Sequence, residues 1–572
     1  MNLKIEEQSS SSAKAEDSFN KRYFPHYFIL FFIAAFLIKC LLASIVPITG
    51  DEAEYIYWGQ HLAWGYYDHP PMIAWWLAPF VKISVANLWV RMPQILVTSI
   101  ISILLYYVCR YIETQNPALR STGNPVSRDR ENSTSHGLSA GPIPQKISKR
   151  AFWIALLFLI SPVNLLDIFI VTDTPLMLFT FLAVTLLYFA EKRNDIILHI
   201  IAGICFGAAY LSKFLMFPVM LGVLAYFLFV PNVKNRFKKL LCLALGGLPF
   251  LLQNIVWNYN NSWVNYAFNI TLRNEDDSFQ FSTAFEYFVT LLYLFNPAII
   301  YYFIKHIKGI LSQSKLNFLY LHSRKGDNPE SPTSAISPAF AIFFWVFITP
   351  LLFYFVTSFY HRIGLHWLFC FYTFAFILLL KVLTPSEIKK CIGFTLVYSL
   401  VHVIAVCAIA AMPISVWQNH TSFNKLIFLL KYHDLENIAA PYVKKGYVVM
   451  TPNYSHSYSI AYRPRWEVAD WGVNSVHARQ DDFSSDFRQF DHKNVVIIDF
   501  HFIEPTKYAP YFDSISLEEK NLNGVPYQLV LGKNFHYEDY RENVLQKINA
   551  EYYQLPQWLP YAHNYYAQKY DL

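Results

Sequence analysis

The sequence predicts a polytopic α-helical membrane protein that ends in a C-terminal extracytoplasmic α/β domain. Hydrophobic residues make up 54% of the 572 residues and charged residues only 15%, whereas soluble domains average about 25% charged residues. The apolar residues are gathered in long runs before residue 413, and polar residues dominate after it. This distribution argues against a soluble cytosolic enzyme and against a disordered chain. The net charge of +6 is spread over short loops, so no nucleic-acid partner is expected.

Eleven apolar runs have the length and composition of candidate membrane spans. A polar tail, residues 1–26, precedes the first run without a small-residue cleavage site, so we expect an uncleaved signal anchor. The region 161–214 is the hardest to divide, because charged residues crowd its boundaries. We therefore expect about eleven or more transmembrane helices within a domain at 27–412. The runs lie at approximately 27–47, 92–109, 151–168, 174–190, 196–212, 214–230, 238–257, 285–304, 338–357, 367–380 and 391–412.

The positive charges assign an orientation to these spans. With the N-terminus in the cytoplasm, the inside segments and their boundaries carry 25 Lys and Arg residues, and the outside loops before the tail carry five. Such an excess is typical of cytoplasmic loops. The loop 111–150 is then cytoplasmic, and its Ser, Gly, Asn and Pro content predicts disorder. An odd number of spans places residues 413–572 outside.

The C-terminal segment, residues 413–572, changes to a β-rich pattern. Three short runs are rich in β-branched and aromatic residues and are separated by Pro, Asn, Asp and Gly turns. They are YVVMTPNY at 447–454, NVVIIDF at 494–500 and VPYQLVLG at 525–532. We expect a small α/β domain docked on the outer membrane face.

Acidic residues gather in the first outside loop, residues 48–91. Asp51, Glu52 and Glu54 directly follow the first span, and Asp68-His69 precedes two prolines. Charged groups beside a membrane are costly and tend to mark function. The alternative is an interfacial helix with an aromatic belt, which explains the many Trp and Tyr residues of this loop. It does not explain acidic clusters at both ends of one short loop.

Further charged residues lie at other outside boundaries. Asp173 starts a span just before Pro175 and could be a plain helix cap. Lys213 lies between two apolar runs and could be a lysine that snorkels to the interface. The functional alternative is a site in which carboxylates face cations, and this combination suits an anionic, phosphorylated lipid substrate. The other outside cations are His69, Arg91, Arg273, Arg362, His361 and His366.

The order of several motifs resembles the bacterial membrane glycosyltransferases of the GT-C fold. The similar branches are the protein O-mannosyltransferase-like proteins and the lipid A aminoarabinose transferases. The motifs cover residues 48–273, about half the chain, with a weaker echo in HRIGLHW at 361–367. They are GDEAEYIYW, YYDHPPMIAWW, VTDTPLMLF, GICFGAAYLSKF and LPFLLQNIVWNYNNSWVNYAFNITLR. The resemblance implies transfer of a sugar from a polyprenyl-phosphate carrier on the non-cytoplasmic face, with inversion.

The resemblance also implies roles for individual residues. Asp51, Asp173 and Glu52 are the predicted catalytic residues, and Asp51 matches the presumed base. Lys213, Arg273 and His69 are the predicted donor-phosphate-binding residues. The predicted substrate-binding residues are Asp68, Glu54, Arg362 and His366. The loop 258–273 carries Asn265 and Asn269 but no histidine, so the metal-ligand histidine of the aminoarabinose branch has no match here. No cofactor is assigned, and a divalent cation stays an open alternative.

We therefore predict an enzyme, a membrane glycosyltransferase that uses a lipid-linked sugar and modifies a lipid or protein acceptor in the cell envelope. Its partners are the polyprenyl-phosphate sugar donor, the acceptor and membrane lipids. The resemblance places it in the cell inner membrane as a multi-pass protein with a periplasmic C-terminal domain. A transporter or flippase of envelope glycan assembly is the first alternative, and a non-enzymatic assembly protein is the second. The sequence leaves open the sugar, the acceptor, the metal requirement and the oligomeric state.

Overall fold

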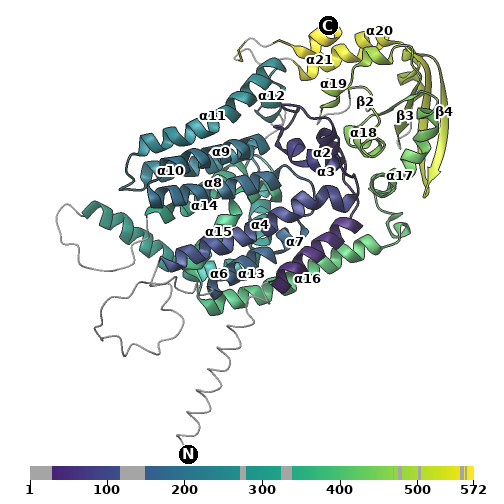
Figure 1. The fold of residues 1–572 in the computed structure, drawn as a ribbon. Helices are drawn as coiled ribbons and strands as arrows, with labels where there is room; N and C mark the ends of the chain where they lie inside the picture. The colour runs from purple at the N-terminus through teal and green to yellow at the C-terminus, as the bar shows by residue number, and fades with distance from the viewer. Residues whose placement is uncertain are drawn as a thin grey trace, which may run out of the picture.

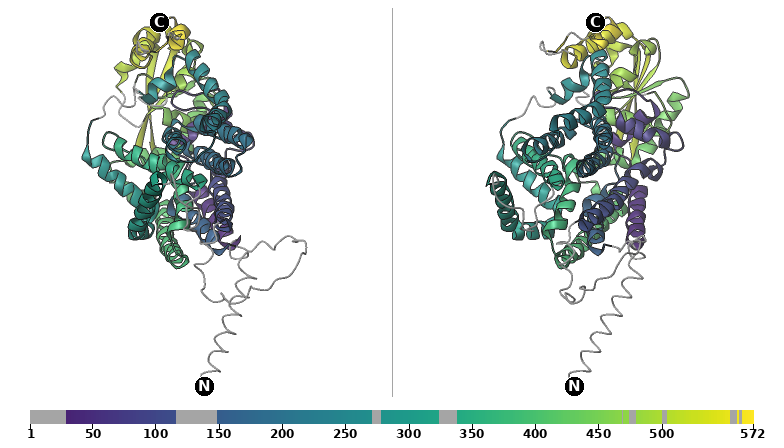
Figure 2. Two further views of the ribbon diagram at one scale, coloured as in Figure 1. Left: turned by 90° about the vertical axis from the view of Figure 1, so that its left-hand side faces the viewer. Right: turned by 60° about the vertical axis from the view of Figure 1, so that its left-hand side comes forward.

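The protein is described here from a computed structural model. The structure describes residues 29–115, 148–270, 278–323, 338–467, 469–473, 479–499, 504–553, 559–560 and 563–572, and for residues 308–323 it describes the backbone only. A bundle of long helices carries the C-terminal sheet at one end, and the C-terminus lies at this same end (Figure 1). Both turned views keep the sheet at that end of the bundle (Figure 2).

Apolar helices account for most of the bundle. Each of the eleven predicted spans falls on a helix or on two consecutive helices. These are Ile29–Ile45, α4 (Asn87–Thr114), α6 (Lys149–Leu159) with α7 (Pro162–Leu166), α8 (Asp173–Arg193), α9 (Ile196–Ser212), α10 (Phe217–Phe229), α11 (Arg236–Asn260), α13 (Phe281–Ser323), α14 (Ala341–Thr357), α15 (Phe369–Val382) and α16 (Pro385–Ala411).

Within the described residues, six helices are long and apolar enough to cross a membrane, or seven if Ile29–Ile45 and α2 (Gly50–Gln60) form one bent span. These two helices meet at an angle of 95°, and α2 packs against the C-terminal part of the chain. We therefore treat α2 as lying outside the spans. Helices such as α9 and α14 are apolar but only 17 residues long, near the lower limit for a span of about 17–25 residues. The predicted total of eleven stays a prediction.

One predicted span, 151–168, is divided in the structure. Helix α6 ends at Leu159, and α7 starts at Pro162 with Ser161 as its N-cap residue. Proline lacks the backbone N–H needed inside a helix but fits the first helical position. The Ser161-Pro162 pair therefore explains the break that the apolar pattern alone does not reveal.

Close contact between α9 and α11 depends on two glycines. A Cβ atom at Gly203 would lie 2.2 Å from the carbonyl oxygen of Leu243, and one at Gly246 would lie 2.2 Å from that of Ile200. Small residues allow membrane helices to approach this closely. Helix α9 is thereby held between α11 and α8, which fixes the end of α9 that carries Lys213.

The C-terminal segment contains a five-stranded mixed sheet with the order β2-β1-β3-β5-β4. Strand β1 pairs in parallel with β2 and β3, whereas β5 pairs antiparallel with β3 and β4. Strands β1 and β3 fall within the first two β-rich runs of the sequence, and β5 starts with the third run and extends three residues beyond it. The strands are β1 (Val448–Thr451), β2 (Ala469–Asp470), β3 (Val495–Asp499), β4 (Phe512–Leu522) and β5 (Val525–Phe535).

The two faces of the sheet bury different sets of side chains. Val496 and Ile498 point toward helix α17 (Phe423–Val443) and share a core with it. Val495 and Ile497 lie in a second core with aromatic residues from the end of the chain. This follows from the alternation of side chains along a strand. Burial on both faces explains why the first four residues of β3 are apolar.

Helix α18 (Tyr454–Ala461), which follows β1, docks this C-terminal part on the first loop. It packs against α2, and Tyr57 of α2 lies 5.1 Å from Tyr458, measured between ring centroids. The backbone carbonyl of Tyr462 accepts a hydrogen bond from Gln60 Nε2 at 3.0 Å. The first loop is therefore enclosed between the helix bundle and the C-terminal sheet (Figure 1).

We predict that the loop 111–150 and the C-terminal segment from residue 413 lie on opposite sides of the membrane, because positive charge concentrates in the cytoplasmic segments. Topology reporters fused at about residue 130 and about residue 480 should report opposite compartments. A fusion at the polar tail before residue 27 serves as the control and should agree with the first reporter. The same compartment for the first two reporters would contradict this orientation.

Candidate functional site

The predicted acidic residues of the two outside loops act together on the ionisation of Tyr55, a buried residue of α2. Burial raises the pKa of Tyr55 well above its ordinary value, and neighbouring carboxylates raise it further. These carboxylates come from both predicted loops, and the structure thus brings them into one electrostatic neighbourhood. They are Asp68, Asp51, Glu54 and Asp173.

Asp51 lies on the exposed side of α2, in its first turn. Its Oδ1 accepts a hydrogen bond of 2.9 Å from the hydroxyl of Tyr454, the first residue of α18. The carboxylate is therefore oriented by the C-terminal part of the chain while its side chain stays accessible to solvent. A general base needs both an orientation and access to its substrate.

Glu52, the next residue, faces the interior and is fully engaged. Its Oε1 and Oε2 accept hydrogen bonds from Arg91 Nε at 2.8 Å and Arg91 Nη2 at 2.6 Å. Oε1 also accepts the backbone N–H of Ile170 at 2.9 Å, and Oε2 caps α2 through Thr49. A buried carboxylate with all these partners has little capacity left to take a proton from a substrate, so its contacts fit a positioning role better than the predicted catalytic one.

Arg91 extends this interaction to the end of the first helix. Its Nη1 donates to the carbonyl oxygens of Ala43 and Val46 at 3.0 and 2.7 Å, and its Nη2 donates to that of Pro47 at 2.8 Å. Both Arg91 and Glu52 are buried. The guanidinium group thereby ties the first helix, α2 and α4 together at one point.

Glu54 is only 2% exposed, and its Oε1 has no hydrogen-bond partner among the described residues. Burial raises its pKa well above the ordinary value, and nearby acidic groups of the loop and of the C-terminal segment raise it further. A neutral Glu54 is the form that such an environment favours. The contributing groups, largest first, are Asp68, Asp51, Asp470 and Asp481.

The pair Asp68-His69 is held in place by the segment that follows α11. His69 Nε2 lies 3.6 Å from Asp68 Oδ2. Asn265 Nδ2 donates to the carbonyl oxygens of Tyr66 and Tyr67, and Asn269 Nδ2 donates to that of Asp68 at 2.9 Å. Both asparagines belong to α12 (Val264–Ile270) and are four residues apart, so they lie on one face of this helix. They position the backbone of the predicted site.

Asp173 and Lys213 form a buried ion pair at the ends of two adjacent helices. Asp173 is the first residue of α8, and Lys213 is the C-cap residue of α9. Lys213 Nζ lies 2.7 Å from Asp173 Oδ2. Asp173 Oδ1 is buried without a hydrogen-bond partner among the described residues. The pair thus keeps one buried acceptor oxygen that no described group satisfies, in contrast to a pair whose carboxylate oxygens are all hydrogen-bonded.

The other end of α8 carries such a fully satisfied pair. Lys239 Nζ lies 3.0 Å from Glu191 Oε2, His199 Nε2 lies 2.8 Å from Oε1, and the hydroxyl of Tyr226 also donates to Oε2. Glu191 is separated from Asp173 by 18 residues, which is about 27 Å along a helix. One helix therefore carries a closed ion pair at one end and an open one at the other.

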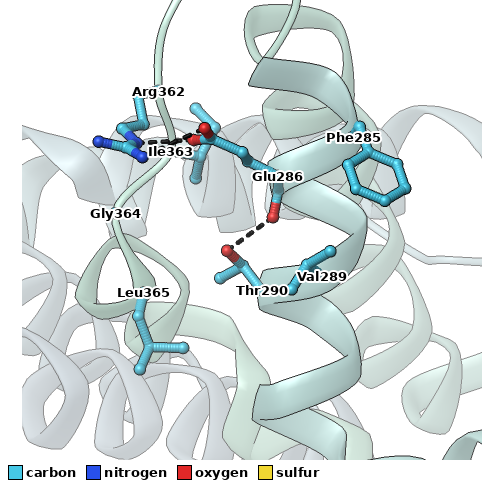
Figure 3. A pocket seen from close by; sticks show the side chains of 8 residues that line it. All are labelled: Phe285, Glu286, Val289, Thr290, Arg362, Ile363, Gly364 and Leu365. Atoms are coloured by element: carbon cyan, nitrogen blue, oxygen red, sulfur yellow. Dashed lines mark hydrogen bonds and ion pairs between the residues drawn. The ribbon is translucent and has the colours of Figure 1, made fainter. Parts of the chain in front are cut away.

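Two predicted residues lie elsewhere, and the position of a third is not described. Arg362 pairs with Glu286 of α13 at 2.6 Å and lines a separate cavity (Figure 3). His366 is exposed on the same segment, in η4 (Leu365–Leu368). Arg273 lies outside the described residues. Within the part of the chain that the structure describes, no three His, Cys, Asp or Glu side chains are grouped closely enough to hold a metal ion.

The structure also shows polar contacts that the sequence analysis did not identify. Lys39, a buried residue of the first helix, donates to Thr98 Oγ1 of α4 and interacts with the buried Asp167. The sequence contained one signal for this contact, because a single lysine within an apolar run is expected to have a polar partner. Tyr454 had no such signal, because its partner Asp51 lies 403 residues earlier in the chain.

Comparison with known proteins identifies two matches. Residues 68–123 and 146–257 match the model of the dolichyl-phosphate-mannose-protein mannosyltransferase family. The lipid A galacturonosyltransferase RgtD of Rhizobium johnstonii is 24% identical over 230 residues, which is 40% of this chain and 40% of the relative. Both matches confirm the predicted resemblance to GT-C-type glycosyltransferases and support a membrane enzyme of that class. The family match includes Asp68, His69, Asp173 and Lys213.

We predict that Glu52→Gln destabilises the protein by roughly 3–5 kcal/mol, because it leaves the Arg91 guanidinium buried without its counter-charge. Thermal unfolding of the purified protein in detergent measures this effect. Asp51→Asn is the matched control, since it makes the same chemical change one residue earlier on the exposed side of α2, and it should unfold near the wild-type temperature. Equal stability of both variants would show that the Glu52–Arg91 contact is dispensable.

Proposed function

We propose that the protein transfers a sugar from a polyprenyl-phosphate donor to a hydroxyl group of a lipid or protein acceptor on the non-cytoplasmic face of the cell inner membrane. The observation that carries this proposal is the buried Lys213–Asp173 pair with its open acceptor, which shares the surroundings of Tyr55 with the exposed Asp51. In this arrangement the C-terminal segment from residue 413 covers the site from the periplasmic side.

Lys213 is suited to receive the phosphate of the donor. A compact ammonium group stabilises negative charge that develops on a leaving phosphate. Asp173 orients this ammonium through Oδ2 at 2.7 Å, and its Oδ1 remains available for a substrate hydroxyl. His69 is a second donor group near the same carboxylates, since its ring centroid lies 6.0 Å from that of Tyr55. We assign Arg273 to the phosphate as well, from the resemblance alone.

Asp51 is suited to activate the acceptor. In the proposed reaction the acceptor oxygen forms a bond with the anomeric carbon, and its proton passes to the Asp51 carboxylate. The bond between the anomeric carbon and the phosphate oxygen breaks, and its electron pair leaves with the polyprenyl phosphate. Attack from the side opposite the phosphate inverts the anomeric centre. A phosphate leaving group needs no protonation, so one base and one set of cations suffice.

The names of the matched proteins support this class of reaction. The name of the matched family refers to a sugar carried on a lipid phosphate and to a protein acceptor. The name of the relative refers to lipid A and to a galacturonosyl group. The donor class is common to the proposal and the family name, whereas the two names differ in sugar and acceptor. We therefore leave both acceptor classes within the proposal. The flippase alternative has no comparable support.

We predict that Asp51→Asn lowers the transfer rate by about 10²–10⁴-fold, the usual contribution of a general base. The amide keeps the shape of the side chain but cannot accept the proton. Product formation by the purified enzyme with a polyprenyl-phosphate sugar donor measures the rate. Tyr454→Phe is the control, because it removes only the hydrogen bond to Asp51, and its loss should be much smaller. More than about a tenth of the activity in Asp51→Asn would move the base to another carboxylate.

We predict that Lys213→Gln weakens donor binding and slows turnover, with partial rescue by Lys213→Arg, because a cation must face the phosphate but Arg differs in shape. Donor affinity and single-turnover rate in nanodiscs measure both effects.

Lys239→Gln is the matched control for Lys213→Gln, since it breaks the closed ion pair at the other end of α8. It should reduce stability while donor affinity of the folded fraction stays near wild type. If Lys213→Gln retained normal affinity and rate, Lys213 would be a structural residue like Lys239.

A further inference from the structure

A cavity of about 460 Å³ opens between α13 and the segment that precedes α15 (Figure 3). Most of its wall is apolar and includes Phe285, Val289 and Leu365. Glu286 and Arg362 also line the cavity, where they contact each other directly and supply opposite charges. The volume is within the usual range of about 300–1,000 Å³ for sites that bind small ligands.

The Glu286–Arg362 pair is exposed, in contrast to the buried pairs of the bundle. Arg362 Nε lies 2.6 Å from Glu286 Oε2 and Nη2 lies 3.1 Å from Oε1. The two side chains are 78% and 43% exposed. An exposed pair of this kind contributes only about 0–1 kcal/mol to stability. Folding therefore does not require the pair, and both charges are accessible to a ligand.

The helix beside the cavity presents a continuous apolar surface. Its exposed apolar side chains follow the spacing of one helix face, which is typical of contact with lipid chains. They are Phe281, Phe285, Phe288, Val289 and Leu292. At the start of this face, Phe279 stacks on Phe359 with ring centroids 5.4 Å apart. Aromatic residues of this kind collect at the boundary between lipid and water.

We propose that this cavity binds one zwitterionic membrane phospholipid with an ethanolamine-type headgroup. Arg362 binds the phosphate, Glu286 accepts hydrogen bonds from the ammonium group, and the acyl chains follow the apolar face of α13. Glu286 and Arg362 together carry one negative and one positive charge, and they complement a headgroup that also carries one charge of each sign. A purely anionic headgroup would be attracted by Arg362 but repelled by Glu286, which lies within hydrogen-bond distance of Arg362.

This assignment replaces the predicted role of Arg362 in binding the reacting substrate. The cavity is nevertheless linked to the proposed site through η4. Leu365 begins η4, and α15 follows η4 directly. Cys370, the second residue of α15, donates a hydrogen bond from Sγ to the carbonyl oxygen of Leu215 at 3.7 Å. Leu215 is two residues from Lys213. A lipid in the cavity would therefore restrain the segment that packs beside the Lys213 end of α9.

Native mass spectrometry of the full-length protein in detergent tests the proposal. The protein is titrated with phosphatidylethanolamine, phosphatidylcholine and phosphatidylglycerol of identical acyl chains. We expect the highest occupancy with phosphatidylethanolamine, because the choline group cannot donate a hydrogen bond to Glu286 and phosphatidylglycerol lacks a cation. Equal occupancy by the three lipids, or a preference for phosphatidylglycerol, would overturn the proposal.

Two single substitutions assign the preference to this cavity. Glu286→Gln should remove the advantage of phosphatidylethanolamine over phosphatidylglycerol, a change of about fivefold for one exposed charge contact. Arg362→Gln should weaken binding of all three phospholipids, since each carries a phosphate. Arg488→Gln is the control, because it removes an exposed pair with Asp486 in the C-terminal segment, and it should keep the wild-type order. An unchanged order and affinity in both cavity variants would also overturn the proposal.

A second measurement covers the case in which a charge variant folds poorly. Phosphatidylethanolamine should raise the thermal unfolding temperature of the wild-type protein, because a ligand that binds only the folded state stabilises it. The double substitution Glu286→Arg with Arg362→Glu retains both charges and should keep this response. Loss of the response in the double variant, with normal unfolding in the absence of lipid, would contradict headgroup recognition by the pair.

Discussion

The buried contact between Glu52 and Arg91 is the constraint on which the candidate site depends. Arg91 holds the carbonyl groups at the end of the first helix, and Glu52 holds the N-terminus of α2 and the backbone N–H of Ile170. Asp51 is the neighbour of Glu52, and Asp173 follows Ile170 by three residues. One ion pair thus fixes the two outside loops relative to each other. A buried pair of this kind is costly to desolvate, and its many hydrogen bonds offset that cost.

The ion pairs at the two ends of α8 differ in how fully their carboxylates are hydrogen-bonded. Both Lys–carboxylate pairs are buried. Glu191 has three side-chain partners from α9, α10 and α11, so its capacity is used within the bundle. Asp173 keeps a buried oxygen without a partner among the described residues. A buried unsatisfied acceptor costs free energy unless a ligand completes it, and this cost is consistent with a position retained for substrate.

The apolar helices of the bundle and strands β1, β3 and β5 could be predicted from the sequence because both depend on local patterns, whereas β4 was not predicted. Apolar runs located the helices, and β-branched runs located β1, β3 and β5. The division of roles among Asp51, Glu52 and Glu54 could not be predicted in this way. These three acids lie within one turn of α2, and the neighbours that distinguish them, Tyr454 and Arg91, are distant in sequence. Tertiary contacts decide which carboxylate is exposed, which is paired and which is kept neutral.

The C-terminal segment completes the site because it contributes both contacts and charge. Tyr454 orients Asp51, and Gln480 Oε1 accepts the backbone N–H of Tyr67 at 2.8 Å, next to Asp68. Burial raises the pKa of Glu54, and acidic groups of the loop and then of this same segment raise it further. The neutral form of this buried carboxyl, which its environment favours, places no negative charge near the exposed Asp51. A neutral Glu54 reduces the charge repulsion between the loop and the docked sheet. Several acidic residues can therefore lie close together at this place.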